Sequence, residues 1–174
     1  MLVRELAASE LVRIGEIDRS ETADGFYVVE DGRLQRVERR LEIPTWSEAE
    51  LEETLERLAR GLAAGGLMLG IVDGPRLAAA ALLGGEPLDG ERERLELVFL
   101  HVSRPHRRHG LAGALFDEVC VRARQRGAEQ LYISSSDVEP AVRFYLARDC
   151  RLAERVDRAI ASRWPADIPL ELDL

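Results

Sequence analysis

The stretch from Val102 to Leu115, VSRPHRRHGLAGAL, gathers residue types that bind phosphate. It holds three arginines, two of the chain's three histidines and two glycines, and a helical pattern follows. A glycine-rich turn that enters a helix points several backbone N–H groups at one place, and the helix dipole adds partial positive charge there. Arg107 and Arg108 add bidentate donors. The junction predicts a pyrophosphate site; the alternative is a solvated basic turn that caps a helix.

The elements that must position this junction are a strand before it and a helix after it. Apolar patterning predicts the strand from about Leu95 to Val102 and the helix from Leu111 to Arg126, ending at Gly127. The other expected strands are 2–6, two strands within 26–43 around the turn Asp31-Gly32, and 67–72, 77–83, 131–136, 151–156 and 169–174. The other expected helices are 9–17, one within 47–66, and a short one through Ala141, Phe144 and Tyr145.

Two S-x-x-E capping boxes mark helix starts, Ser47 with Glu50 and Ser136 with Glu139. Leu51, Leu55, Leu58 and Leu62 give the first of these helices an apolar stripe. The order of elements predicts an α+β fold, a mixed sheet with helices on its faces. At 174 residues, the chain is expected to form one domain, 1–174.

Composition excludes several classes of function. The formal net charge is −8, which argues against a general nucleic-acid binder. The chain contains no lysine, so a lysine nucleophile or P-loop lysine is excluded. Cys120 and Cys150 lack metal-ligand spacing, no histidine–carboxylate spacing indicates a metal, and neither a signal peptide nor a membrane-spanning run is recognisable. We expect a protein with reduced thiols in the cytoplasm that binds no metal, membrane or nucleic acid.

The junction resembles a family motif. Arg107-Arg108-His109-Gly110-Leu111-Ala112 fits the R/Q-x-x-G-x-G/A pattern of the GNAT superfamily of acyl-CoA-dependent N-acyltransferases, with a strand before it and a helix after it. The resemblance is best from about Leu95 to Leu152. It implies a GNAT-like fold, a central mixed but mostly antiparallel sheet of about six to seven strands flanked by about four helices. It also implies acetyl-CoA as co-substrate.

Carried over by position, the resemblance implies a cofactor site in two parts. Amides from His109 through Gly110, Leu111 and Ala112 to Gly113, with Arg107 and Arg108 beside them, would hold the pyrophosphate of coenzyme A. The backbone of Leu100, His101 and Val102 would pair with the pantetheine arm like an added strand, and an N–H near Leu100 would polarise the acetyl carbonyl.

The resemblance also implies two catalytic residues. Glu96, eleven positions before Arg107, lies where several family members carry a general base, and the attacking amine must lose a proton. Burial between Leu95 and Leu97 would raise its pKa; the alternatives are an exposed strand glutamate or a water relay. Tyr145, in RFYLARDC, matches a tyrosine that protonates the departing thiolate, and the alternative is a core aromatic.

Two positions depart from the family pattern. Val138 stands where an asparagine is common, and Asp149-Cys150 stands where Gly-Phe is common, which puts the exit of the short helix in question. Among the histidines, His101 fits either a proton relay or a half-buried strand residue, whereas His106 and His109 are expected to contact phosphate or solvent.

The sequence therefore predicts an N-acetyltransferase that transfers acetyl from acetyl-CoA directly to a primary amine. Residues 19–46, between the first two helices, are expected to cover the acceptor site, whose acidity favours a cationic small molecule. The alternatives are an acyl-CoA sensor without turnover and an acetyltransferase acting on a protein N-terminus or lysine. A homodimer through the final strands is compatible with the pattern.

Overall fold

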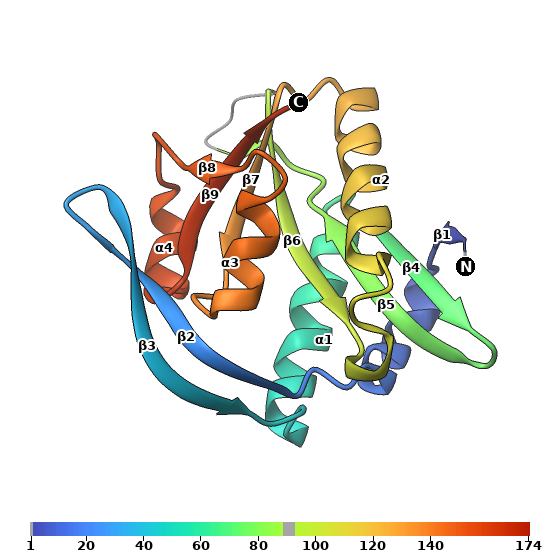
Figure 1. The fold of residues 1–174 in the computed structure, drawn as a ribbon. Coiled ribbons are helices and arrows are strands. Elements are labelled where there is room, and N and C mark those ends of the chain that lie inside the picture. Colours follow the sequence, from blue (N-terminus) through green and yellow to red (C-terminus); the bar gives the residue numbers. More distant parts are fainter. Residues whose placement is uncertain (1, 89–92) are drawn as a thin grey trace.

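The computed structural model describes residues 2–88 and 93–174. Seven strands form one sheet in the order β1-β4-β5-β6-β7-β9-β8, and β2 and β3 form a separate ribbon (Figure 1). Among the described residues, β6 and β7 are the only neighbours that pair in parallel. The sheet strands are β1 Val3–Glu5, β4 Leu67–Asp73, β5 Arg76–Leu83, β6 Arg94–Val102, β7 Gln130–Ser135, β8 Arg151–Leu152 and β9 Ile168–Asp173. This is the predicted α+β, mostly antiparallel sheet with helices on its faces.

The helices divide between the two faces of the sheet. α2 (Leu111–Gln125) and α3 (Glu139–Leu146) pack on one face, where Leu115, Val119 and Val142 join the larger apolar core. α1 (Glu48–Ala63) and the 3-10 helix η1 (Ala8–Glu16) cover the other face, against a second core that includes Leu58 and Phe99. α4 (Arg158–Arg163) lies behind β9 in Figure 1, on the side of α1.

Local sequence signals explain the best-defined boundaries. The Ser47 hydroxyl accepts a hydrogen bond from the Glu50 amide, and the Glu50 carboxylate accepts one from the Ser47 amide, so the first predicted capping box is confirmed. Asp31 and Gly32 both have positive φ at the tip of the ribbon, which joins β2 (Glu21–Glu30) to β3 (Arg33–Ile43). Gly127 ends α2 with a φ of 81°.

Two expectations near the C-terminus are wrong, and one helix there has no counterpart in the sequence analysis. Ser136 and Glu139 do not form a capping box, because Val138 is the N-cap of α3 and Glu139 pairs with Arg36 at 2.9 Å. The strand expected at 151–156 is limited to Arg151–Leu152. The residues after it form α4, which was not expected; its N-cap is Asp157, whose carboxylate accepts from the Ile160 amide at 2.9 Å.

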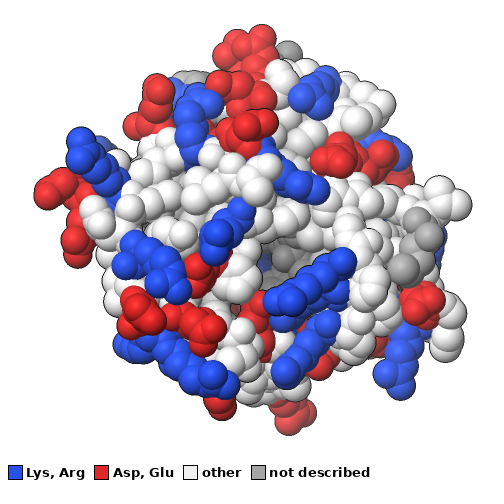
Figure 2. Space-filling model, in the orientation of Figure 1, with Lys and Arg blue, Asp and Glu red and all other residues white. Residues whose placement is uncertain are grey.

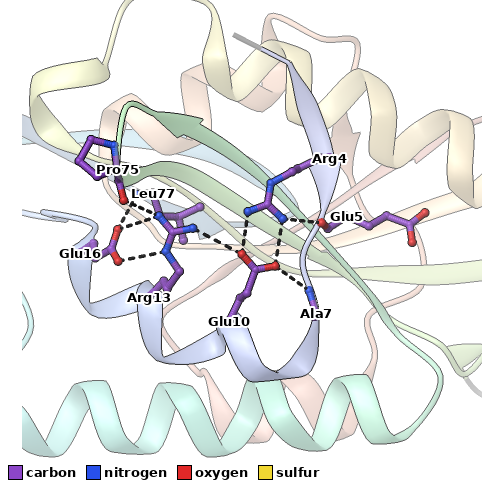
Figure 3. A network of polar contacts seen from close by, with 8 residues as sticks. All are labelled: Arg4, Glu5, Ala7, Glu10, Arg13, Glu16, Pro75 and Leu77. Atoms are coloured by element: carbon purple, nitrogen blue, oxygen red, sulfur yellow. Dashed lines mark hydrogen bonds and ion pairs between the residues drawn. The ribbon is translucent and has the colours of Figure 1, made fainter.

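A polar network ties the N-terminal segment to the sheet (Figure 3). Arg4 contacts both carboxylate oxygens of Glu10, at 2.7 and 2.9 Å. Arg13 pairs with Glu16 at 3.1 Å and donates to the carbonyl of Pro75, in the β4–β5 turn, at 2.8 Å. These contacts fix η1 over the end of the sheet that carries the β4–β5 turn.

Candidate active site

A β-bulge opens the sheet between β6 and β7. Leu83 pairs with Leu97 and Leu82 with Phe99, so Val98 is an extra residue in β6. The parallel ladder with β7 stops at Leu97, although β6 continues to Val102. Figure 1 shows the two strands close together at one end and apart at the other. We call this opening, bordered by 98–102 on β6 and 134–135 on β7, the β6–β7 fork.

The bulge also brings polar residues to one face. Leu95 and Leu97 pack in the core under α2, whereas Phe99 packs in the core under α1, so the alternation of side chains changes at Val98. His101 contacts the rings of Trp46 and Phe99, with centroids at 5.4 and 4.7 Å. At the fork, α2 and α3 therefore lie on one face of the sheet, and the side chains of Glu96 and His101 lie on the other face.

The start of α2 is a tight turn with two residues in the left-handed region. Arg108 and Gly110 have φ values of 63° and 80°, and a turn with such residues presents successive amides on one concave side. Gly110 is the N-cap and offers no side-chain cap. Within 2–88 and 93–174, no acceptor satisfies the first-turn amides of Leu111, Ala112 and Gly113. The helix dipole adds partial positive charge at these amides.

The two arginines of the motif have different surroundings. The guanidinium of Arg107 donates to the carbonyls of Val102, Ser20 and Arg19 at 3.0–3.1 Å and pairs with Glu21 at 3.2 Å. It therefore ties the end of β6 to the segment that leads into β2. Arg108 and His109, in contrast, are exposed beside Gly110.

An arginine outside the motif lies against the same turn. A Cβ at Gly113 would come within 2.0 Å of a terminal nitrogen of Arg148, so this guanidinium rests directly on the first turn of α2. It also stacks 4.6 Å from the Phe144 ring. Figure 2 shows a hollow between the positions of α3 and α2, with basic side chains along its rim. The sequence motif missed Arg148 because it comes from the turn after α3.

Glu96 lies on β6, two residues before the bulge, and is largely shielded from solvent. Burial raises its pKa to about 7, and the positive charge of Arg57 opposes this shift. The pairing of Glu96 with Tyr132 places the carboxylate beside β7. A carboxyl group with this pKa is half protonated near neutrality, which suits a group that accepts a proton.

Tyr145 packs from α3 into the larger core and is 7% exposed. Burial raises the pKa of its hydroxyl, and Cys150 and Asp167 add smaller contributions in the same direction. In the part of the chain that the structure describes, the hydroxyl has no hydrogen-bond partner. Tyr145 is therefore a core aromatic whose hydroxyl stays protonated at neutral pH.

The histidines have three different environments. Burial, with smaller contributions from the charges of Arg19, Arg57 and Arg107, lowers the pKa of His101 to about 3, so its imidazole is neutral. His106 contacts Asp73 at 3.1 Å. His109 is exposed beside Gly110.

A cavity of about 510 Å³ lies between the β2–β3 ribbon, β7 and the segment from α4 to β9. Its aromatic lining comes from Phe26, Tyr27, Tyr132 and Trp164. Its charged lining residues are Asp137 and Asp167, which make no ion pair with any described residue.

Both of these carboxyl groups are affected by their position in the cavity wall. Burial raises the pKa of Asp137 and of Asp167. The hydroxyl of Ser134 donates to Asp167 at 2.8 Å and opposes the shift there, while the charge of Asp137 adds to it. No sequence motif indicated these two residues, because the ribbon and the α4–β9 segment meet only in the folded chain.

Neither a metal site nor a membrane span is visible in residues 2–88 and 93–174. No three His, Cys, Asp or Glu side chains there are grouped to hold a metal ion. No helix in these ranges is long and apolar enough to cross a membrane.

Comparisons with known proteins agree with this geometry. A family model described as the acetyltransferase (GNAT) family matches residues 22–150. A search of curated protein sequences gave no match.

Solved structures share the fold over nearly the whole chain. Nourseothricin acetyltransferase superposes with a TM-score of 0.74 at 20% identity, over 99% of this chain and 97% of that one. PaiA N-acetyltransferase from Thermoplasma acidophilum, solved with coenzyme A, gives 0.64 at 14% identity over 99% and 98%. Ribosomal-protein-alanine N-acetyltransferase from Brucella melitensis gives 0.63 at 17% identity over 100% of both. The TM-scores of these superpositions establish a common fold.

Proposed function

Because the chain belongs to the GNAT family of acetyltransferases, we propose that it transfers an acetyl group from acetyl-CoA to a primary amine. The transfer is direct, with no acyl-enzyme, and it requires no metal. Acetyl-CoA is a co-substrate in this proposal.

One observation carries the cofactor half of the proposal. The amides of Leu111, Ala112 and Gly113 lack acceptors among the described residues, and they lie at the end of β6 where the fork is open. A pyrophosphate placed there would satisfy them, with Arg108 and Arg148 as nearby cations.

The open edge of β6 would receive the rest of the cofactor. The backbone of Leu100, His101 and Val102 would pair with the pantetheine arm, since β7 has already separated from β6 there. The family's oxyanion-type contact would come from an N–H near Leu100. Arg107 would contribute by fixing the end of β6, because its side chain is engaged by backbone carbonyls.

Glu96 and Tyr145 would carry the proton transfers. Glu96, or a water it holds, takes a proton from the acceptor ammonium, and the free amine attacks the acetyl carbonyl carbon. The C–N bond forms and the C–S bond breaks. Tyr145, whose raised pKa keeps its hydroxyl protonated, then gives a proton to the thiolate of coenzyme A. The attacking nitrogen loses its second proton as the amide forms, and this proton restores the Tyr145 hydroxyl.

The acceptor would enter through the cavity beside the β2–β3 ribbon. This ribbon occupies most of 19–46, the segment expected from the sequence to cover the acceptor. Asp137 and Asp167, with the rings of Tyr27 and Trp164, favour a cationic amine of small-molecule size. We further place the protein in a reducing compartment such as the cytoplasm, since Cys120 and Cys150 are free thiols, and retain a homodimer through the final strands as a hypothesis.

The first test is acetyl-CoA binding by calorimetry at low salt, with wild type and Gly110→Glu. A carboxylate at Gly110 would repel the pyrophosphate, and we expect affinity to fall at least about tenfold, or about 1.4 kcal/mol. Gly110→Ala is the matched control. A Cβ at this position meets no atom within 4 Å, so this variant carries the same φ penalty without charge.

The outcomes separate the rival functions. Binding that is lost in Gly110→Glu and kept in Gly110→Ala supports the cofactor site. Binding with no thiol release across a broad amine panel favours the sensor. Acetylation of peptides in preference to small amines favours a protein acetyltransferase. Wild type that binds no acetyl-CoA would contradict the proposal.

A further inference from the structure

Arg57 reaches from α1 to the bulge that opens the fork. Its Nη1 donates to the carbonyl of Val98 at 2.8 Å. Val98 is the residue that the bulge leaves without a partner in the ladder with β5. The hydrogen bond therefore fixes the backbone where β6 separates from β7.

Aromatic rings hold the guanidinium in place. It lies 6.0 Å from the centroid of Phe99 and 5.7 Å from that of Trp164, within reach of a cation–π contact with each. Within the described ranges no carboxylate lies in ion-pair contact with Arg57. Its charge is thus placed in a partly apolar site where it acts over a longer distance than in water.

Arg57 and Glu96 are each other's strongest electrostatic partners. Among the charges that act on Glu96, Arg57 has the largest effect, followed by Asp157 and Arg163 from the α4 side. Tyr132, paired with Glu96 on β7, is a further titratable neighbour of this carboxyl. The charges of Arg163, Glu53 and Asp167 also act on Arg57. Arg57 stabilises the ionised carboxylate against burial, and Asp157 opposes it.

We propose that Arg57 is a positioning residue for acetyl transfer: it holds the Val98 carbonyl, and so the fork, and it places a positive charge on the face of β6 that carries Glu96. The proposal rests on the acetyltransferase function proposed above. In this proposal, one side chain of α1 influences both the shape of the β6–β7 fork and the protonation of Glu96.

The test compares Arg57→Lys, which keeps a charge and a donor, with Arg57→Met, which keeps only length and apolar bulk. The carboxyl carbons of all glutamates are labelled with carbon-13, and their NMR shifts are followed from pH 5 to pH 9. Glu96→Gln identifies the Glu96 signal. This experiment needs neither cofactor nor acceptor, so it does not depend on turnover.

We expect the Glu96 pKa to rise by about one unit in Arg57→Met and by less than about half a unit in Arg57→Lys. Amide hydrogen exchange at 98–100 should be faster in Arg57→Met only. If Arg57→Met does not fold, Arg57→Gln, also uncharged, provides the same titration. An unchanged Glu96 pKa in the uncharged variants, or identical behaviour of the Lys and Met variants, overturns the proposal.

Acetyl-CoA calorimetry separates this inference from the proposed function. Wild type that binds acetyl-CoA, together with the expected titrations, supports both. Wild type that binds none, with the titrations as expected, refutes the acetyltransferase role and with it the assignment of Arg57 as a positioning residue.

Discussion

Burial changes the chemistry of single residues around the fork. Glu96 and His101 lie on one strand and the same face, but burial favours the neutral form of each and so moves their pKa values in opposite directions, to about 7 and about 3. The carboxyl therefore titrates near neutrality, and the imidazole stays uncharged across the physiological range. At this scale the site has one candidate base, Glu96, whereas His101 serves as a neutral contact for Trp46 and Phe99.

Glu96→Gln should stabilise the protein at high pH and not at low pH. The folded state binds the Glu96 proton more tightly than the unfolded chain, so wild type loses stability as pH rises from about 4.5 to about 7. At pH 8 the variant should be more stable by about 1–3 kcal/mol, with little difference at pH 4. Urea unfolding at both values measures this.

The control for that experiment is Glu52→Gln, on the exposed side of α1, which should change stability by less than about 0.5 kcal/mol at either pH. An equal effect of Glu96→Gln at pH 4 and pH 8 would contradict the buried carboxyl. The rate of acetyl transfer should fall in Glu96→Gln although the protein is more stable at high pH, because this variant lacks the proposed proton acceptor.

Asp149→Gly should stabilise the fold. Asp149 has a φ of 60°, in the left-handed region, so the chain adopts a glycine conformation after α3 without a glycine. We expect a gain of about 0.5–1 kcal/mol in unfolding free energy, because released strain exceeds the added entropy of the unfolded chain. Asp149→Ala should instead destabilise. A loss of stability in the glycine variant would show that the Asp149 side chain has a role of its own.

The elements differ in how well the sequence predicts them. Turn glycines and the Ser47–Glu50 capping box act within a few residues, so the β2–β3 ribbon, α1, β6 and α2 are predicted well. α4 was missed, and the strand at 151–156 was overextended, because tertiary packing beside β9 decides these segments.

The candidate site also has a part that local sequence signals predict and a part that depends on tertiary packing. The turn at Gly110 follows from a local motif. Arg57, Arg148, Asp137 and Asp167 reach the site only through packing between elements distant in sequence, so no short pattern could indicate them. The predicted roles of Glu96 and Tyr145 stay predictions.

Tyr27→Pro should loosen the ribbon without affecting the start of α2. The Tyr27 amide donates to the carbonyl of Asp137 at 2.8 Å and not to β3, so proline removes the link to the α3 side and no bond within the ribbon. Hydrogen exchange monitored by mass spectrometry should be at least about tenfold faster across 21–43. The affinity for acetyl-CoA should change less than about twofold.

Tyr27→Ala, which keeps the amide, is the control and should leave exchange in the ribbon nearly unchanged. Faster exchange in α2 of the proline variant would show that the ribbon and the start of α2 are not independent.

Over the whole molecule, two groups of carboxyls change the pH dependence of stability in opposite directions. Ion pairs and backbone contacts lower the pKa of Glu10 and Glu50 to about 2, and these contributions are lost as pH falls from about 4.5 toward 2. Burial raises the pKa of Glu96, Asp137 and Asp167, and their penalty grows as pH rises above about 4. Net charge also grows more negative above the isoelectric point of about 5.0.

Stability should therefore be greatest near pH 5, below the pH at which Glu96 is fully ionised. Thermal unfolding from pH 3 to pH 9 at constant ionic strength measures this maximum. Glu96→Gln should move the maximum toward neutrality. A melting temperature that still rises from pH 6 to pH 8 would contradict the prediction.

The fork also has a consequence for synthesis on the ribosome. The strands β1, β4, β5 and β6 all precede residue 103, and β7, β8 and β9 all follow residue 129. The first four strands can pair with one another while the rest of the chain is still being translated, and α2 emerges next. At about 5–20 residues per second, the β7 side of β6 waits about 1–6 s for its partner. When β7 arrives it covers only Arg94 to Leu97, so the rest of that nascent edge stays without a strand partner among residues 2–88 and 93–174.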